Sequence, residues 1–269
     1  YLFFLRLFLA YLNSLKILSK ISFIKFNGCF LIYFIIAKQR FIKDLWINNR
    51  MKIRLNYKPK NPIIIEGFPG FGLVSTIATE FLIKHLDAKK IGSIWSNEIQ
   101  PIAAVHEGSP LDPIGIFYSR KKNIIIVHAI TNVNGLEWKI SDAILELSQL
   151  LKAKELISLE GIGSTESLSR TFYYSTDDKT SKKFDKLGIM PLKEGIIIGV
   201  SGALMLKAKK LNSFFVETSV GLADSKAAAK IIEILNNYLK LGVDIKPLIK
   251  SAEKFEEKLT RVAAAAAGR

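Results

Sequence analysis

The segment IIIEGFPGFGLV, residues 63–74, decides the fold class of this chain. Its three isoleucines are typical of a buried strand, and the glycines and proline that follow predict a tight turn. After the turn, apolar residues recur at the three- and four-residue spacing of a helix that is buried on one side. These residues are Val74, Ile77, Ala78, Phe81 and Leu82. The segment predicts a strand, a glycine-rich loop and a helix, the opening unit of an α/β domain.

The same alternation of strands and helices continues along the chain. Further strands are expected at residues 52–57, 91–95, 102–106, 115–118, 123–128, 156–159, 196–200 and 214–216. Amphipathic helices are expected from near Asn134 to Leu151, after the N-cap residue Asp224, and from Leu248 onward. This order predicts a three-layer α/β/α sandwich with a mostly parallel central sheet.

The expected C-terminal helix carries apolar side chains at helical spacing between charged ones. Such a stripe either packs back on its own domain or pairs with another subunit, and the sequence leaves both explanations open. The candidate interface residues are Leu248, Ala252, Phe255 and Leu259.

Composition divides the chain into three parts, of which the first is the most unusual. Residues 1–50 hold eight Lys and Arg against one acid, Asp44, although they are rich in Phe, Leu and Ile. Basic residues interrupt the apolar runs before any reaches the roughly 18 residues that a membrane span requires. Residues 51–262 are expected to form a single α/β/α domain, and residues 263–269 a low-complexity, alanine-rich tail.

Charge and cysteine content exclude several classes of protein. The formal net charge of +15 is spread along ordinary helix faces and does not form an arginine-rich stripe, so no nucleic-acid partner is expected. Cys29 is the single cysteine, which excludes an internal disulfide and fits a reducing cytoplasmic location. No group of Cys and His has zinc-site spacing, so no metal is expected.

Small and polar residues follow the predicted strands. In an open α/β sheet these positions lie along the edge where ligands usually bind, so they are candidates for a pocket that holds a small anion. The alternative is that glycines and hydroxyls serve only as turn and cap formers. The candidates are Gly67, Gly70, Gly72, Gly161, Gly163, Ser164, Ser201, Gly202, Glu217 and Thr218.

The chain contains no complete catalytic constellation. The segment GVSGA around Ser201 matches the nucleophile pattern G-x-S-x-G only in part, because alanine replaces the last glycine. His106 and His128 end strands, but only Glu107 lies near either of them at a spacing that could assist general-base or metal chemistry. The sequence therefore predicts no catalytic residue and no cofactor.

The order and spacing of these motifs resemble the proteasome assembly chaperone family, in its archaeal branch. The resemblance covers roughly residues 63–259 and leaves out residues 1–50. The segments that carry it are EGFPGFGLV (66–74), KIGSI (90–94), VHEG (105–108), EGIGS (160–164), RTFY (170–173), GIIIGVSGAL (195–204), ET (217–218) and DSKAA (224–228).

The resemblance implies an α/β/α sandwich similar in outline to nucleoside phosphorylases. It also implies a non-catalytic homo-oligomer that binds proteasome α subunits or assembly intermediates. Some family members dock on the α-ring through a hydrophobic-Tyr-any tail, which the last residues here, Ala267-Gly268-Arg269, do not match. The alternative is an enzyme that binds a nucleotide or phosphate at the glycine-rich loops, in the manner of a phosphorylase or a carboxylate-amine ligase.

Met51 opens the first predicted strand, and we expect it to be the true start of the protein, with residues 1–50 a translation of upstream sequence. N-terminal sequencing of native protein is expected to begin at Met51. Recovery of residues 1–50 would reject this expectation and favour the competing explanation, a basic segment that anchors the protein on a membrane surface.

Overall fold

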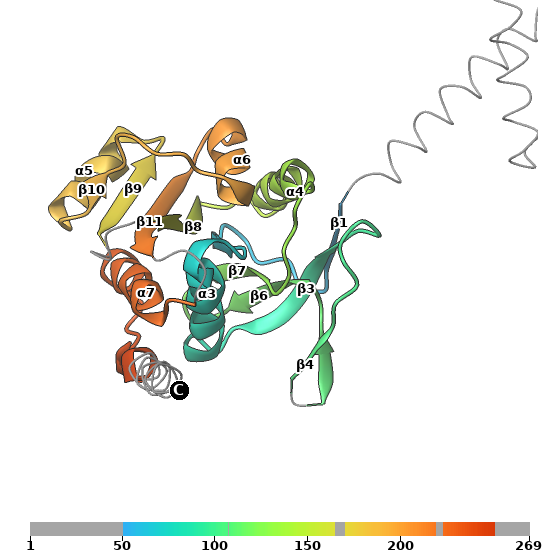
Figure 1. Ribbon diagram of the computed structural model, residues 1–269. Helices are drawn as coiled ribbons and strands as arrows, with labels where there is room; N and C mark the ends of the chain where they lie inside the picture. The colour runs from blue at the N-terminus through green and yellow to red at the C-terminus, as the bar shows by residue number, and fades with distance from the viewer. Residues whose placement is uncertain (1–50, 107, 165–169, 219–222, 251–269) are drawn as a thin grey trace, which may run out of the picture. The chain divides into compact units, whose positions relative to one another are not determined.

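The structure is a computed structural model that describes residues 51–106, 108–164, 170–218 and 223–250. These residues belong to one compact unit, Arg50–Arg269 (Figure 1). Within them, none of the helices combines the length and the apolar content that crossing a membrane requires.

A nine-stranded mixed sheet forms the middle of the domain. The four central strands run parallel to one another, and the strand on either side of them joins the centre in an antiparallel pair. The centre is therefore parallel as predicted, whereas a tight connection, such as the hairpin on one side of the centre, makes the adjoining strand antiparallel. The strand order is β1 (Lys52–Leu55), β3 (Lys89–Trp95), β6 (Ile114–Ser119), β7 (Ile124–Ala129), β2 (Ile63–Gly67), β8 (Glu155–Gly163), β11 (Asn212–Thr218), β9 (Thr171–Ser175) and β10 (Met190–Pro191).

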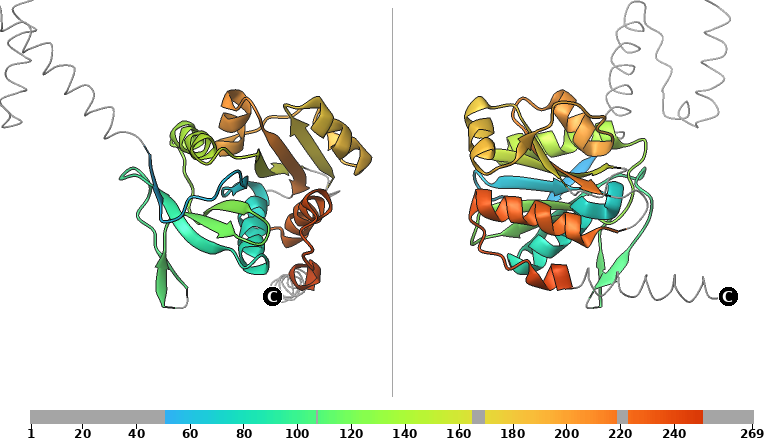
Figure 2. Two further views of the ribbon diagram at one scale, coloured as in Figure 1. Left: turned by 180° about the vertical axis from the view of Figure 1, so that it is seen from behind. Right: turned by 60° about the vertical axis from the view of Figure 1, so that its left-hand side comes forward.

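Helices cover both faces of this sheet, which confirms the three-layer prediction (Figures 1 and 2). One face carries α3 (Val74–His85), α5 (Asp178–Lys186) and α7 (Ser225–Leu239), and their apolar side chains share one core cluster. The other face carries α4 (Glu137–Leu150) and α6 (Gly199–Lys207), which pack on a second cluster. Asp224 caps α7 as expected, since its side chain accepts a hydrogen bond from the backbone N–H of Ala227.

The predicted strand at residues 196–200 is wrong. This stretch is an exposed loop that leads into α6, and the side chains of Ile196 and Ile198 are 90% and 60% exposed. Three consecutive isoleucines predict a buried strand, but the helical spacing of Val200, Ala203 and Leu204 just after them decides the local structure.

The predicted strand at residues 102–106 is shorter than expected and lies outside the main sheet. Only β4 (Ala104–His106) forms, and it pairs with β5 (Ser109–Leu111) in a separate two-stranded sheet. The hairpin projects from the body of the domain beside β3 (Figure 1).

A single aromatic side chain anchors α5. This helix is rich in lysine, and Phe184 is its only buried residue. The Phe184 ring lies edge-on to Tyr173, Phe214 and Tyr238, with ring centroids 4.9 to 5.1 Å apart. Edge-to-face packing of this kind adds to the stabilisation that burial alone provides.

We expect Phe184→Ala to lower the free energy of unfolding by about 3–5 kcal/mol, because it empties the aromatic cluster that holds α5. Phe184→Leu should cost less, and Lys186→Ala on the exposed side of α5 should change stability by no more than about 0.5 kcal/mol. Urea denaturation of the three variants provides the measurement. Equal stability of Phe184→Ala and Lys186→Ala would contradict this account of α5.

Candidate functional site

The glycine-rich turn after β2 lies directly on the ends of β8 and β11. A side chain at Gly70 would overlap the carboxylate of Glu160, and one at Gly161 would overlap the backbone carbonyl of Phe71. Gly72 has a positive φ of 63° and packs against the Thr218 side chain. Protein atoms fill the space beside these glycines, so the arrangement favours the explanation that they permit close packing in a turn.

The remaining glycines on the list of candidates have local roles of the same kind. Gly67 packs against the Ser75 carbonyl in the first turn of α3. Gly163, at the end of β8, pairs with Thr218 of β11. The backbone N–H of the next residue, Ser164, donates a hydrogen bond to the Thr218 carbonyl oxygen at 3.1 Å. Gly202 lies within α6 and allows the backbone to approach Ile197.

Two buried carboxyl groups, Glu66 of β2 and Glu160 of β8, are the most unusual feature of this corner. Ser158 Oγ donates a hydrogen bond to Ser201 Oγ at 2.9 Å, and Ser201 Oγ donates to Glu160 Oε2 at 3.0 Å. Glu66 is fully buried, and neither of its carboxyl oxygens has a hydrogen-bond partner among the described residues. This corner therefore contains one satisfied and one unsatisfied carboxyl group beneath α6.

Burial controls the protonation of this pair. Loss of solvent raises the pKa of Glu66 to about 8, although the nearby Ser158 and Ser201 hydroxyls partly oppose the shift. Burial also raises the pKa of Glu160 to about 8, with a further contribution from the charge of Glu66. Both carboxyls hold a proton at neutral pH, so the corner carries no charge that would attract an anionic ligand.

Ser201 does not have the surroundings of a hydrolytic nucleophile. Its side chain is buried with 1% of its surface exposed, and the two partners of its hydroxyl are Ser158 and Glu160. No imidazole hydrogen-bonds to it among the described residues, so a nucleophile–histidine pair is absent there.

The two strand-end histidines are separate. His128 is buried in β7, where its Nδ1 lies 2.9 Å from Thr79 Oγ1, and burial lowers its pKa to about 4. His106 belongs to the projecting hairpin. His128 is therefore a neutral, hydrogen-bonded core residue at physiological pH. No cluster of three or more His, Cys, Asp or Glu side chains suited to a metal ion occurs in the described part of the chain.

The Glu217 side chain links β11 to the start of β9 through Arg170. Its carboxylate accepts hydrogen bonds from Arg170 Nε at 2.9 Å and from Arg170 Nη2 at 2.6 Å. The Arg170 side-chain hydrogen bond holds the pKa of Glu217 below its usual range. Thr218 Oγ1 donates to Asp224 at 2.8 Å, which connects the same strand end to the cap of α7.

Leu248, the first of the candidate interface residues, is 9% exposed and belongs to the core cluster beneath α3 and α7. The Leu248 side chain therefore packs on its own domain. Ala252, Phe255 and Leu259 lie outside the described residues.

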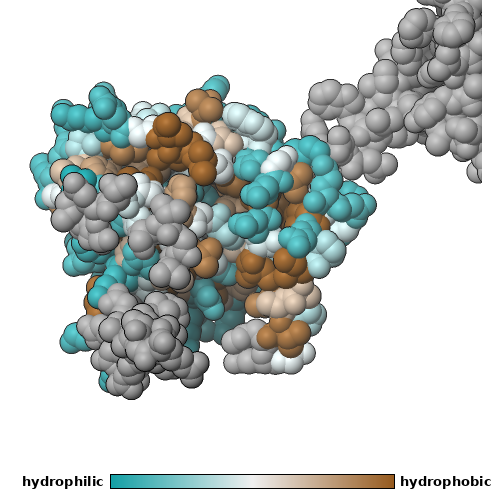
Figure 3. All heavy atoms as spheres, in the orientation of Figure 1, coloured by the Kyte–Doolittle hydropathy of each residue, from teal (hydrophilic) through white to brown (hydrophobic). Residues whose placement is uncertain are grey.

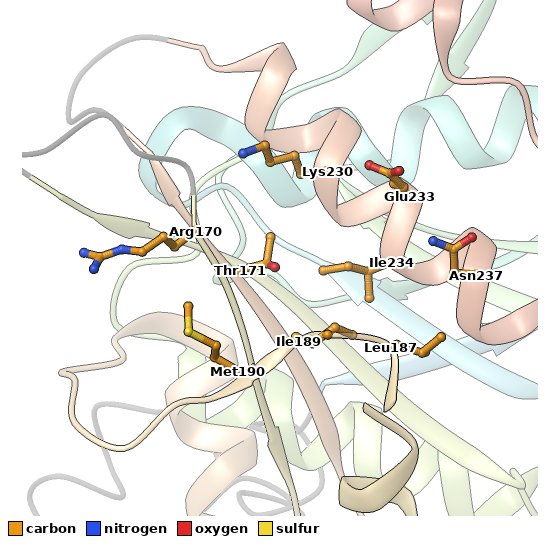
Figure 4. Close-up of a pocket in the computed structure, with 10 residues that line it drawn as sticks. Arg170, Thr171, Leu187, Ile189, Met190, Lys230, Glu233, Ile234 and Asn237 are labelled. Atoms are coloured by element: carbon orange, nitrogen blue, oxygen red, sulfur yellow. The ribbon is translucent and has the colours of Figure 1, made fainter. Parts of the chain in front are cut away.

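A groove of about 440 Å³ lies between α7 and the segment that connects α5 to β10 (Figure 4). Ile189 and Ile234 are the buried apolar residues of its lining, and the partly exposed side chains of Leu187 and Met190 also face it. Lys230 on α7 adds a polar group to the wall (Figure 4). Sequence reasoning missed this groove, because its residues come from three segments that are distant in sequence and share no common motif.

Replacing Glu66 tests the buried carboxyl pair. Since the folded-state pKa values lie above the usual 4.5, folding is favoured most below that value, and this contribution is lost as pH rises from about 5 to about 8. Glu66→Gln should therefore weaken the fall in melting temperature across this range and raise stability at pH 8 relative to the native protein. Glu146→Gln on the exposed side of α4 is the matched control. If the melting temperatures of Glu66→Gln and of the native protein changed with pH in the same way, the raised pKa of Glu66 would be contradicted.

Comparison with solved structures finds the same fold in two proteins of an archaeon. Pyrococcus furiosus PbaA, described as an archaeal homolog of proteasome-assembly chaperone, superposes with a TM-score of 0.74 at 34% sequence identity. The match covers 82% of this chain and 94% of PbaA. Pyrococcus furiosus PbaB, described as an archaeal proteasome activator, shares the fold with a TM-score of 0.70 at 24% identity, over 80% of this chain and 99% of PbaB.

Sequence comparison agrees with the structural likeness. The uncharacterized protein MJ0106 of Methanocaldococcus jannaschii is 31% identical over 213 residues, which cover 76% of this chain and 86% of that protein. The family model of the PAC2 family matches residues 64–263, which include the glycine-rich turn, the buried carboxyl pair and the groove. The chain belongs to the PAC2 family.

Proposed function

We propose that the protein is a non-catalytic, assembly chaperone-like protein of the cytoplasm that binds proteasome α subunits or assembly intermediates. The observation that carries this proposal is the likeness to PbaA, which combines 34% identity with coverage of 82% of this chain and 94% of PbaA. PbaA is itself described as a homolog of a proteasome-assembly chaperone.

The chemistry of the strand-end corner supports a non-catalytic role. A phosphate-binding loop directs free backbone N–H groups at its ligand and favours negative charge. Here the turn packs on a carboxyl group at Gly70, and Ser201 is engaged with Glu160. The alternative of a phosphorylase-like or ligase-like enzyme therefore gains no support from the arrangement of these residues.

We also propose that the protein acts as a homo-oligomer. A homo-oligomer would present several copies of one binding surface in a defined geometry to a ring of subunits, and most soluble oligomers have closed symmetry of identical copies.

A binding experiment with proteasome α subunits from the same source tests the proposal. We expect the purified protein to co-elute with the α subunits in gel filtration and to change the rate at which α-rings appear on native gels. The control is an unrelated protein of similar positive charge, and the assay is repeated at raised salt, where non-specific attraction to a basic protein is screened. Absence of co-elution together with an unchanged rate of ring formation would contradict the proposal.

A further inference from the structure

The hairpin between β3 and β6 lies outside the main sheet. We call residues 96–106 and 108–113 the arm. Its strands β4 and β5 pair with each other and with no strand of the main sheet. The side chains of Val105 and Ile102 are 74% and 37% exposed. A lone two-stranded hairpin is marginally stable in water, so an arm with exposed apolar side chains gains stability when another surface covers it.

The arm is also electrostatically distinct from the rest of the protein. The 29 residues from Ile91 to Ser119 contain no Lys or Arg, although the whole chain has 39 in 269 residues. The same stretch contains three acids, of which Glu98 and Asp112 form ion pairs with lysines of the domain. An apolar surface that is neutral to slightly acidic can approach a second copy of this basic chain without the repulsion that other faces would meet.

The groove lies at the opposite end of the sheet. The arm extends from β3, near the edge strand β1, whereas the groove is formed beside the other edge strand, β10 (Figures 1 and 4). Residues 178–191, which form α5, β10 and one wall of the groove, contain four Lys and two Asp. The charged side chains of the groove lining itself are Arg170, Lys230 and Glu233, and its Leu187, Ile189, Met190 and Ile234 offer apolar contact surface. The groove thus complements the apolar side chains of the arm, and its two basic residues against one acid suit a segment that lacks Lys and Arg.

We infer that the arm of one copy docks in the groove of a second copy. In the space-filling view the arm is the column at the lower right, and much of it is brown, as a docking element requires (Figure 3). Contact between two different surfaces at opposite ends of the domain is head-to-tail, so repeated contacts build a ring when the rotation closes. This inference rests on the proposed homo-oligomer and names the surfaces that form it.

Charge substitutions on both surfaces test the docking. Val105→Asp places a charge on the arm, and Leu187→Glu places one on the groove wall, where the native side chain is 40% exposed. We expect the native protein to sediment as an oligomer at micromolar concentration and each variant to sediment as a monomer. The matched control is Leu206→Asp on α6, an equally apolar and exposed position outside both surfaces, which should keep the native mass. Circular dichroism confirms that all variants are folded.

Mixing the two variants distinguishes head-to-tail docking from other causes of dissociation. The Val105→Asp copy keeps an intact groove and the Leu187→Glu copy keeps an intact arm, so an equimolar mixture should form a heterodimer that cannot grow further. In a Cys29→Ser background, Val105→Cys mixed with Leu187→Cys should give a disulfide-linked dimer under mild oxidation, whereas Leu206→Cys in place of Leu187→Cys should not.

The outcomes separate this inference from the proposed function. An oligomer that Val105→Asp and Leu187→Glu leave intact would overturn arm docking, while the homo-oligomer would stand. Dissociation by Leu206→Asp as well would also overturn it, because the surfaces would then not be specific. A monomeric native protein would overturn both arm docking and the homo-oligomer. The proposed binding to the proteasome would then still be tested by co-elution with α subunits.

Discussion

The turn after β2 packs tightly on the ends of β8 and β11, and the starts of α3 and α7 depend on this contact. Backbone and carboxyl oxygens occupy the places where side chains would be at Gly70 and Gly161. The Gly72 carbonyl then accepts a hydrogen bond from the backbone N–H of Asp224 at 2.8 Å, which fixes the start of α7. The turn therefore leads into α3 and also fixes the start of α7, which forms one side of the groove.

The same corner shows how a fold can hold carboxyl groups in its interior in neutral form. Glu66 and Glu160 lie beneath α6, where a charged carboxylate would be costly, so both are held as neutral acids. The Ser158 and Ser201 hydroxyls form a chain that ends on Glu160. This network links the central strands to α6, although Glu66 remains unsatisfied among the described groups.

Much of the fold could be predicted from periodicity, and the exceptions have physical causes. Residues 63–74 and the Asp224 cap carry local signals that the structure confirms, because the turn and the cap depend on near neighbours. Residues 196–198 have the composition of β2 but no strand beside them, and a partner strand cannot be read from composition. The burial of Glu66 could likewise not be predicted, because the sequence shows that Glu66 follows three apolar strand residues but not that α6 covers its side chain. The groove combines segments distant in sequence, so only the tertiary structure brings it together.

The attachment of α5 through Phe184 has a consequence for motion. Regions with few buried contacts open at a lower free energy than the core, and such openings occur while the rest of a domain remains folded. Phe184 is the one buried side chain of α5, and Asp185 adds a hydrogen bond from the Tyr173 hydroxyl, so we expect this helix to detach from the sheet before α3 or α7. Leu187, Gly188 and Ile189 follow α5 directly and line the groove, so detachment of α5 would move this wall and change the width of the groove.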